Sequence, residues 1–158
     1  MRTLFALIFA FLLMISCNSR SSDTTNDMTE EPETVKEHNG LEGAWELVGF
    51  YNYKDNVVTD SFNTAEGYRQ VKIYTSTKVM WSKDVPTDST EWFGYGTYKL
   101  EDNTLTEVLD YGSEMMSKII QERKEFIYEI NLSKDSFSQI EIDEDGNRIY
   151  SENYKRIE

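Results

Sequence analysis

The sequence has very little of the two side chains that most often build catalytic and metal sites. Its 158 residues include one cysteine, Cys17, and one histidine, His38. A single cysteine cannot form an internal disulfide, and a zinc site or a cysteine–histidine nucleophile needs more than these two residues. The chain also has no glycine-rich phosphate-binding loop. We therefore expect no catalytic residues, no cofactor and no metal site.

Positive charge is also scarce. The chain has 16 lysines and arginines against 29 aspartates and glutamates, which gives a net charge of −13. A protein this acidic is repelled by nucleic acid and by anionic lipid. We therefore expect no nucleic-acid partner and no electrostatic docking on a membrane.

Residues 1–16 predict a secretory signal peptide. They contain one charge, Arg2, followed by an apolar run that is too short for a stable membrane span. The run ends in LLMISC, and a small residue directly before Cys17 resembles the lipobox of bacterial lipoproteins. That resemblance implies cleavage before Cys17 and lipidation of Cys17, so that the chain is attached to a membrane by its lipid. Loss of Arg2 would take the net charge from −13 to −14. The alternative is an ordinary cleaved signal with an unused thiol.

Residues 17–40 predict a lipidated cysteine and a disordered tether. The stretch is rich in serine, threonine, asparagine and acidic residues and has almost no large apolar side chain. Such a segment cannot bury enough surface to offset the entropy lost on ordering. An aspartate after the cysteine would favour the inner membrane in some bacteria, and Asn18 stands there instead. We therefore expect a lipid-anchored protein of the bacterial cell envelope, attached to the outer membrane and facing either the periplasm or the cell surface.

Residues 41–158 form one domain, and their pattern is typical of an all-β fold. Aromatic and β-branched residues recur in short runs separated by polar turns. Eight strands in an open sheet would leave two unpaired edges, and closure into a barrel removes both. We expect an eight-stranded antiparallel up-and-down β-barrel, with a two-sheet sandwich as the alternative. The expected strands are 43–52, 68–75, 77–83, 91–100, 104–112, 123–132, 136–142 and 147–156.

Two connections are longer than hairpin turns. Residues 53–67 are expected to form a loop that covers the mouth of the barrel. Residues 113–121 place apolar side chains at helical spacing after Ser113, a possible N-cap, and predict a helix of one or two turns or a bulky loop. These apolar side chains are Met115, Met116, Ile119 and Ile120.

The two ends of the domain carry a family resemblance. Gly43 and Trp45 in GAWELVGF, together with Arg156 in NYKRIE, resemble the first and last strands of the calycin superfamily, which includes the lipocalins. The stretches 71–81, 93–111 and 152–158 are similar to lipocalin-like domains of Bacteroidota-type lipoproteins. The resemblance implies that Trp45 plugs one end of the barrel and that Arg156 packs on its ring. A guanidinium on an indole face gains about 0.5–2 kcal/mol.

Alternation along each strand selects the side chains that face the interior. A carboxylate at Glu107, between two inward leucines, must be paired, hydrogen-bonded or protonated. Gly94 and Gly96 either leave volume inside or mark bends that let the sheet close. The residues expected to line a binding site are Trp81, Trp92, Tyr98, Glu107, Tyr111 and Tyr128.

Two functions follow from these expectations. In the first, the barrel holds a small, mostly apolar ligand, with Glu107 as its one acidic anchor. In the second, the barrel is filled, Glu107 belongs to a structural network with Arg156, Lys72 or tyrosines, and an apolar rim docks a protein partner of the envelope. The rim would consist of the four apolar side chains of residues 113–121.

Overall fold

The computed structural model describes residues 40–158. The expected signal peptide, the lipidation at Cys17 and residues 17–39 of the expected tether lie outside the described residues.

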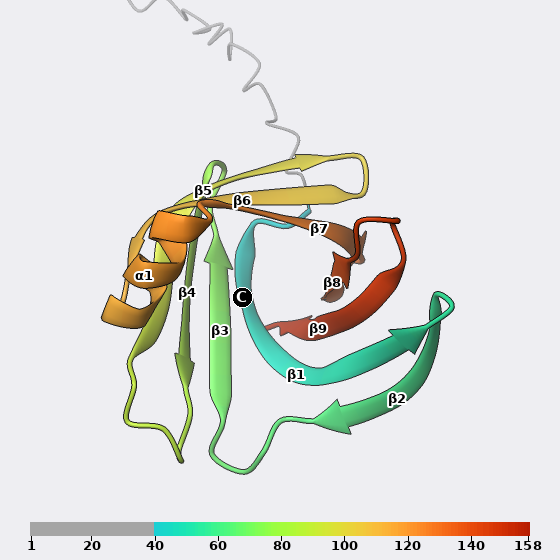
Figure 1. The fold of residues 1–158 in the computed structure, drawn as a ribbon, viewed down its shortest axis with the longest axis horizontal. Coiled ribbons are helices and arrows are strands. Elements are labelled where there is room, and N and C mark those ends of the chain that lie inside the picture. The colour runs from blue at the N-terminus through green and yellow to red at the C-terminus, as the bar shows by residue number, and fades with distance from the viewer. Residues whose placement is uncertain (1–39) are drawn as a thin grey trace, which may run out of the picture. The chain divides into compact units, whose positions relative to one another are not determined.

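The described part of the chain is all-β, with nine antiparallel strands in one sheet and one short helix (Figure 1). The helix, α1, spans Glu114–Glu122 and lies between β6 and β7 in the sequence. No helix in residues 40–158 is long and apolar enough to cross a membrane. The strands are β1 (Gly43–Lys54), β2 (Val57–Asn63), β3 (Arg69–Tyr74), β4 (Lys78–Asp84), β5 (Trp92–Glu101), β6 (Thr104–Gly112), β7 (Glu125–Leu132), β8 (Ser136–Ile142) and β9 (Arg148–Arg156).

The sheet closes in a ring because β1 pairs with the last strand, β9. Trp45 lies opposite Arg156, and the pairing continues to Asn52 opposite Tyr150. On its other edge, β1 pairs first with β3 and then, from Gly49 onward, with β2. The ring therefore runs from β1 through β3 to β9, and β2 extends the sheet beside it.

The expectation of a covering loop at 53–67 is wrong, because most of this segment is the second half of a β-hairpin. Lys54 pairs with Val57, which leaves a two-residue turn at Asp55 and Asn56. Both turn residues have positive φ, 52° and 62°, as a type I′ turn requires. Asp and Asn tolerate this conformation better than most residues, and the Val57-Val58 pair that follows favours a strand.

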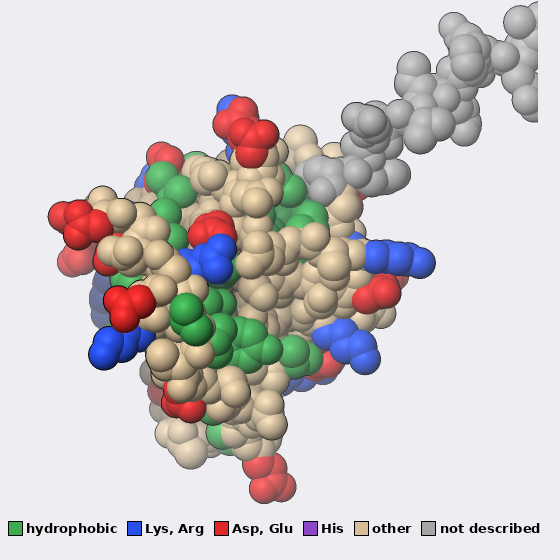
Figure 2. All heavy atoms as spheres, turned by 90° about the vertical axis from the view of Figure 1, so that its right-hand side faces the viewer, with side chains coloured by type: hydrophobic (Ala, Val, Ile, Leu, Met, Phe, Trp, Pro, Cys, Tyr) green, Lys and Arg blue, Asp and Glu red, His purple; other side chains and the backbone are tan. Residues whose placement is uncertain are grey.

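The β1–β2 hairpin leaves apolar side chains at the surface. Val57, Val58 and Phe62 of β2 are all exposed, and hydrophobic side chains form a band among charged ones on this side of the domain (Figure 2). Phe62 stacks on Phe50 of β1, with ring centroids 5.1 Å apart. Phe50 stacks in turn on Tyr150 of β9. An aromatic row therefore connects the hairpin to β9.

The expected helix at 113–121 is confirmed as α1. The side chain of Ser113 caps it by accepting a hydrogen bond from the backbone N–H of Met116. Met116 is buried, while Ile119 and Ile120 are half-buried against the core. Only Met115 of the four apolar residues is exposed. Most of the apolar side of α1 therefore covers the ring and is not presented to a partner.

Candidate ligand-binding cavity

Trp45 and Arg156 lie together where the first and last strands pair, and we refer to this part of the ring as the closed end. The side chain of Trp45 is fully buried, and its indole N–H donates to the carbonyl of Leu41 at 2.8 Å. The guanidinium of Arg156 lies 3.9 Å from the centre of the indole ring, as the family resemblance implied. A Cβ at Gly43 would lie 2.4 Å from Nη1 of Arg156, so glycine provides the space for this stacking.

Arg156 also ties the two ends of the domain together. Its guanidinium donates to the backbone carbonyls of Gly40 and Glu42, each at 2.6 Å, and to that of Lys134 at 2.7 Å. Two separate chain segments, residues 40–42 and Lys134, are therefore held by one side chain over the indole.

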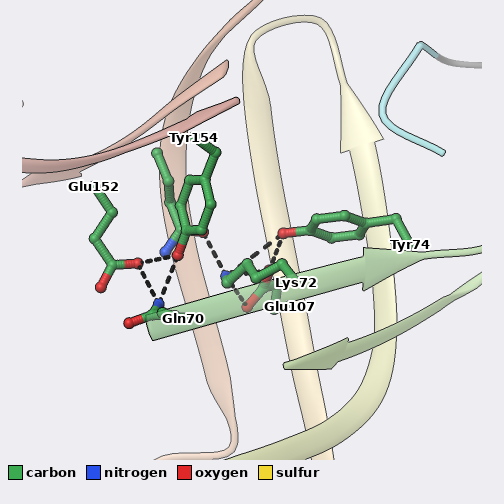
Figure 3. A network of polar contacts seen from close by, with 7 residues as sticks. Gln70, Lys72, Tyr74, Glu107, Glu152 and Tyr154 are labelled. Atoms are coloured by element: carbon green, nitrogen blue, oxygen red, sulfur yellow. Dashed lines mark hydrogen bonds and ion pairs between the residues drawn. The ribbon is translucent and has the colours of Figure 1, made fainter. Parts of the chain in front are cut away.

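Next to the closed end lies a buried ion pair. The ammonium of Lys72 on β3 donates to both carboxylate oxygens of Glu107 on β6, at 2.8 and 3.1 Å, and both side chains are 3% exposed (Figure 3). Lys72 also donates to Oε1 of Gln139 at 2.5 Å. The hydroxyl of Tyr74 donates to Glu107 at 2.5 Å. Burial, followed by the charge of Glu107, raises the pKa of Tyr74 well above its ordinary value.

A second network surrounds Glu152 on β9. Its Oε2 accepts hydrogen bonds from Tyr154 at 2.5 Å and from the amide of Gln70 at 3.1 Å (Figure 3). The same amide of Gln70 donates to the hydroxyl of Tyr154, and Gln70 accepts from Tyr68; both contacts measure 2.6 Å. Within residues 40–158 no lysine or arginine forms an ion pair with Glu152. Glu152 therefore differs from Glu107, whose charge Lys72 neutralises.

The two networks border a cavity of about 290 Å³ inside the ring. Its polar wall includes Gln70, Lys72, Tyr128, Gln139, Tyr150 and Glu152. Its apolar wall includes Trp81, Leu109, Met116, Ile119 and Phe126, of which α1 supplies two. The cavity reaches the surface at Arg123 and Glu141, which are exposed, and Lys83 lies half-buried in its wall.

Some polar atoms of this wall have no partner in the described part of the chain. Oε1 of Gln139 accepts from Lys72, but its Nε2 donates to no protein atom, although the side chain is only 6% exposed. The hydroxyl of Tyr128 has no protein partner either. Every fully buried side-chain nitrogen and oxygen in residues 40–158 does have one. These two groups therefore remain accessible through the cavity.

The structure brings two of the six expected lining residues, Trp81 and Tyr128, to the cavity wall. Glu107 is buried directly beside the wall and is bound to Lys72. This agrees with the expectation that Glu107 belongs to a structural network, and not with its expected role as the acidic anchor of a ligand. Trp92 lies outside the lining, where its indole N–H donates to Asp88 at 3.0 Å.

Tyr98 and Tyr111 are also absent from the cavity wall. Tyr98 is buried near the closed end, where its ring meets that of Tyr74 edge-on and its hydroxyl donates to the carbonyl of Thr75 at 2.7 Å. Tyr111 is 57% exposed and packs on Tyr95, contrary to the expected inward position. The cause is a bulge: Tyr111 pairs with Tyr95 but Leu109 pairs with Gly96, so Asp110 is an extra residue and the alternation reverses.

Sequence reasoning missed Gln70 and Glu152, and alternation along 136–142 leaves open whether Gln139 or Ile140 faces inward. The resemblance implies that Arg156 packs on Trp45, and counting back by two residues from Arg156 reaches Tyr154, then Glu152, then Tyr150. The alternation that located Glu107 was therefore sufficient to find Glu152.

Comparisons with known proteins leave the family open. No protein-family model matches the chain, and no curated protein matches it significantly. A solved structure of an uncharacterized protein from Bacteroides eggerthii DSM 20697 is similar, with a TM-score of 0.47 and 15% sequence identity. The similarity covers 73% of this chain and 98% of that one. Likeness at this level assigns neither a family nor a function.

Proposed function

We propose that the protein is a lipid-anchored, lipocalin-like barrel of the bacterial cell envelope that binds a small molecule inside its ring. The observation that carries the proposal is the cavity of about 290 Å³ with partner-free polar groups in its wall. Ligand pockets combine apolar walls with a few placed polar groups, and their volumes start at about 300 Å³. The ligand is therefore small and has an apolar body.

The free atoms of Gln139 and Tyr128 support a bound molecule over a filled interior. Because both atoms are accessible through the cavity, a ligand that enters it can hydrogen-bond to them. The apolar part of the ligand would lie against Trp81, Leu109 and Ile119, which face the same space.

Two measurements on the full chain test this function. Native mass spectrometry of protein purified from its own membranes should show a retained small molecule. Ile119→Trp places a large ring into the cavity from α1 and should abolish the retained mass. Met115→Trp, on the exposed side of the same helix, should leave it unchanged.

Tryptophan fluorescence gives an independent readout. Of the three tryptophans, Trp81 lines the cavity, Trp45 is buried at the closed end and Trp92 lies outside the lining. Release of the ligand should change the emission of the wild type and of Trp92→Phe, but not that of Trp81→Phe. No retained mass together with no emission change that depends on Trp81 would refute the proposal.

A further inference from the structure

Glu152 is a half-buried carboxylate of the cavity wall, whereas Glu141, the other carboxylate of this wall, is exposed at the surface. Its Oε2 is fixed by Tyr154 and Gln70, which are both neutral donors. Its Oε1 has no partner in residues 40–158. The carboxylate is thus held in place by one oxygen while the other stays available.

The cations of the cavity do not neutralise this carboxylate. The ammonium of Lys72 donates its hydrogen bonds to Glu107 and Gln139. Lys83 lies over the ring of Trp92, with its ammonium 4.3 Å from the ring centre, and Arg123 lies over Phe126 at 4.6 Å. Neither of these two forms an ion pair with Glu152 among the described residues.

Several tyrosines lie near the carboxylate. Tyr128 and Tyr150 share the cavity wall with Glu152. Tyr154 donates to its Oε2, and Tyr68 reaches it through Gln70. Burial first, and the charge of Glu152 next, raise the pKa of Tyr68 to about 12 and that of Tyr154 well above its usual value. Both phenols therefore stay neutral at ordinary pH.

A carboxylate among aromatic rings is a suitable site for an organic cation. An ammonium over a tyrosine or tryptophan face gains about 0.5–2 kcal/mol, and a charge-assisted hydrogen bond to a carboxylate adds to this. The net charge of −13 also draws cations towards the protein.

We infer that the ligand carries an organic ammonium group, which donates to Oε1 of Glu152 among Tyr128, Tyr150 and Trp81. This inference rests on the proposed function and narrows the ligand to small amines with an apolar body. The ammonium donates a hydrogen bond to the free carboxylate oxygen, and the apolar body of the ligand lies towards Leu109 and α1. Glu107 is excluded as the anchor because Lys72 already holds it.

Three probes with one phenyl body and different end groups test the charge preference. They are phenethylamine, 2-phenylethanol and hydrocinnamate, titrated calorimetrically into the full chain after refolding and after native mass spectrometry shows it to be empty. Phenethylamine should bind at least tenfold more tightly than either of the others. Equal or tighter binding of the alcohol or the carboxylate would overturn the inference.

Glu152→Gln tests whether Glu152 is the group that binds the ammonium, because glutamine keeps the shape of the side chain and removes its negative charge. It should weaken phenethylamine at least tenfold and leave 2-phenylethanol unchanged. Glu144→Gln makes the same change of net charge in the exposed turn between β8 and β9 and should leave both affinities unchanged. Should Glu152→Gln not fold, the ranking of the three probes on the wild type still decides.

The outcomes separate this inference from the proposed function. Amine binding that survives Glu152→Gln overturns the inference alone. Binding of 2-phenylethanol without preference for the amine does the same and leaves the cavity as a ligand site. If none of the three probes binds, the inference is also overturned. The proposed function is then decided separately, by native mass spectrometry of the wild type, Ile119→Trp and Met115→Trp.

Discussion

The closed end of the ring and the cavity each contain a glutamate and a tyrosine, but these groups have protein partners near the closed end and are left partly free around the cavity. Near the closed end, Glu107 is paired with Lys72, and the hydroxyl of Tyr74 donates to it. Around the cavity, Glu152 has no cation and Tyr128 has no hydrogen-bond partner in the part of the chain described. The comparison separates groups that stabilise the fold from groups that are left for a ligand.

The largest effect is expected from breaking the buried ion pair. Lys72→Met leaves Glu107 buried without a counter-charge, and removal of one partner of such a pair costs about 3–5 kcal/mol. The free energy of unfolding in urea should fall by this amount. Glu152→Gln, in contrast, should cost less than about 1 kcal/mol, because the amide oxygen still accepts hydrogen bonds.

The double variant Lys72→Met, Glu107→Leu is the control for this prediction. It removes both charges together, so most of the lost stability should return. An equal loss in Lys72→Met and Glu152→Gln would remove the distinction between the two carboxylates.

Two tyrosine-to-phenylalanine variants, one at each place, compare the closed end with the cavity through the same chemical change, the loss of one hydroxyl. Tyr74→Phe removes a buried hydrogen bond to a carboxylate and should cost about 1.5–3 kcal/mol. Tyr128→Phe removes a hydroxyl without a protein partner and should change stability by less than about 0.5 kcal/mol. Urea unfolding of the two variants side by side measures both values. A larger cost for Tyr128→Phe would show that its hydroxyl is structural.

Arg156 tests the closed end alone. Arg156→Ala removes the contact with Trp45 and three hydrogen bonds to exposed or half-buried carbonyls, and it should cost about 2 kcal/mol. Arg156→Lys keeps the charge but not the planar fork, so it should recover about half of the loss. Binding of a ligand in the cavity should be the same in both variants. A loss of binding in a variant that still folds would contradict the separation of the two ends.

The effect of alkaline pH is expected to build up gradually. Burial raises the pKa of Tyr74 and Tyr154 well above 10.0. Below pH 10 both phenols are protonated in the folded and unfolded chains, so the full stability is present. Above pH 10 the unfolded chain loses these protons first, and stability falls by up to about 1.4 kcal/mol per pH unit for each tyrosine until the pH passes the folded pKa.

Urea unfolding midpoints measured below and above pH 10 check this fall of stability with pH. Tyr74→Phe should make the fall less steep, because it removes one of the two titrating phenols. An unchanged slope in Tyr74→Phe would mean that this phenol ionises in the folded protein.

Much of the fold could be predicted from the sequence because alternation and turn residues are local signals. The expected strands correspond to those of the ring, and the expected helix after Ser113 is present. β2 was missed because the turn at Asp55 and Asn56 contains no glycine, although both residues adopt positive φ. A hairpin without glycine in its turn is easily read as a loop.

The candidate site was harder to predict because it depends on contacts between distant strands. Pairing of Lys72 with Glu107 joins β3 to β6 across the ring, and one sequence offered several partners for this carboxylate. Gly94 and Gly96 do not create free volume. The ring of Trp81 lies over Gly94, and a Cβ at Gly96 would lie 2.0 Å from the carbonyl oxygen of Val108. The bulge at Asp110 moved Tyr111 outward, and no local signal marked it.

The pairing of β1 with β9 has a consequence for the order of folding. The first strand of the domain finds the partner for one whole edge only in residues Tyr150–Arg156. Contacts between such distant segments form slowly, because the intervening chain must first be ordered. Until β9 has docked, β1 and β8 each expose a strand edge that is open to aggregation. The ring therefore closes only when β9 pairs with β1.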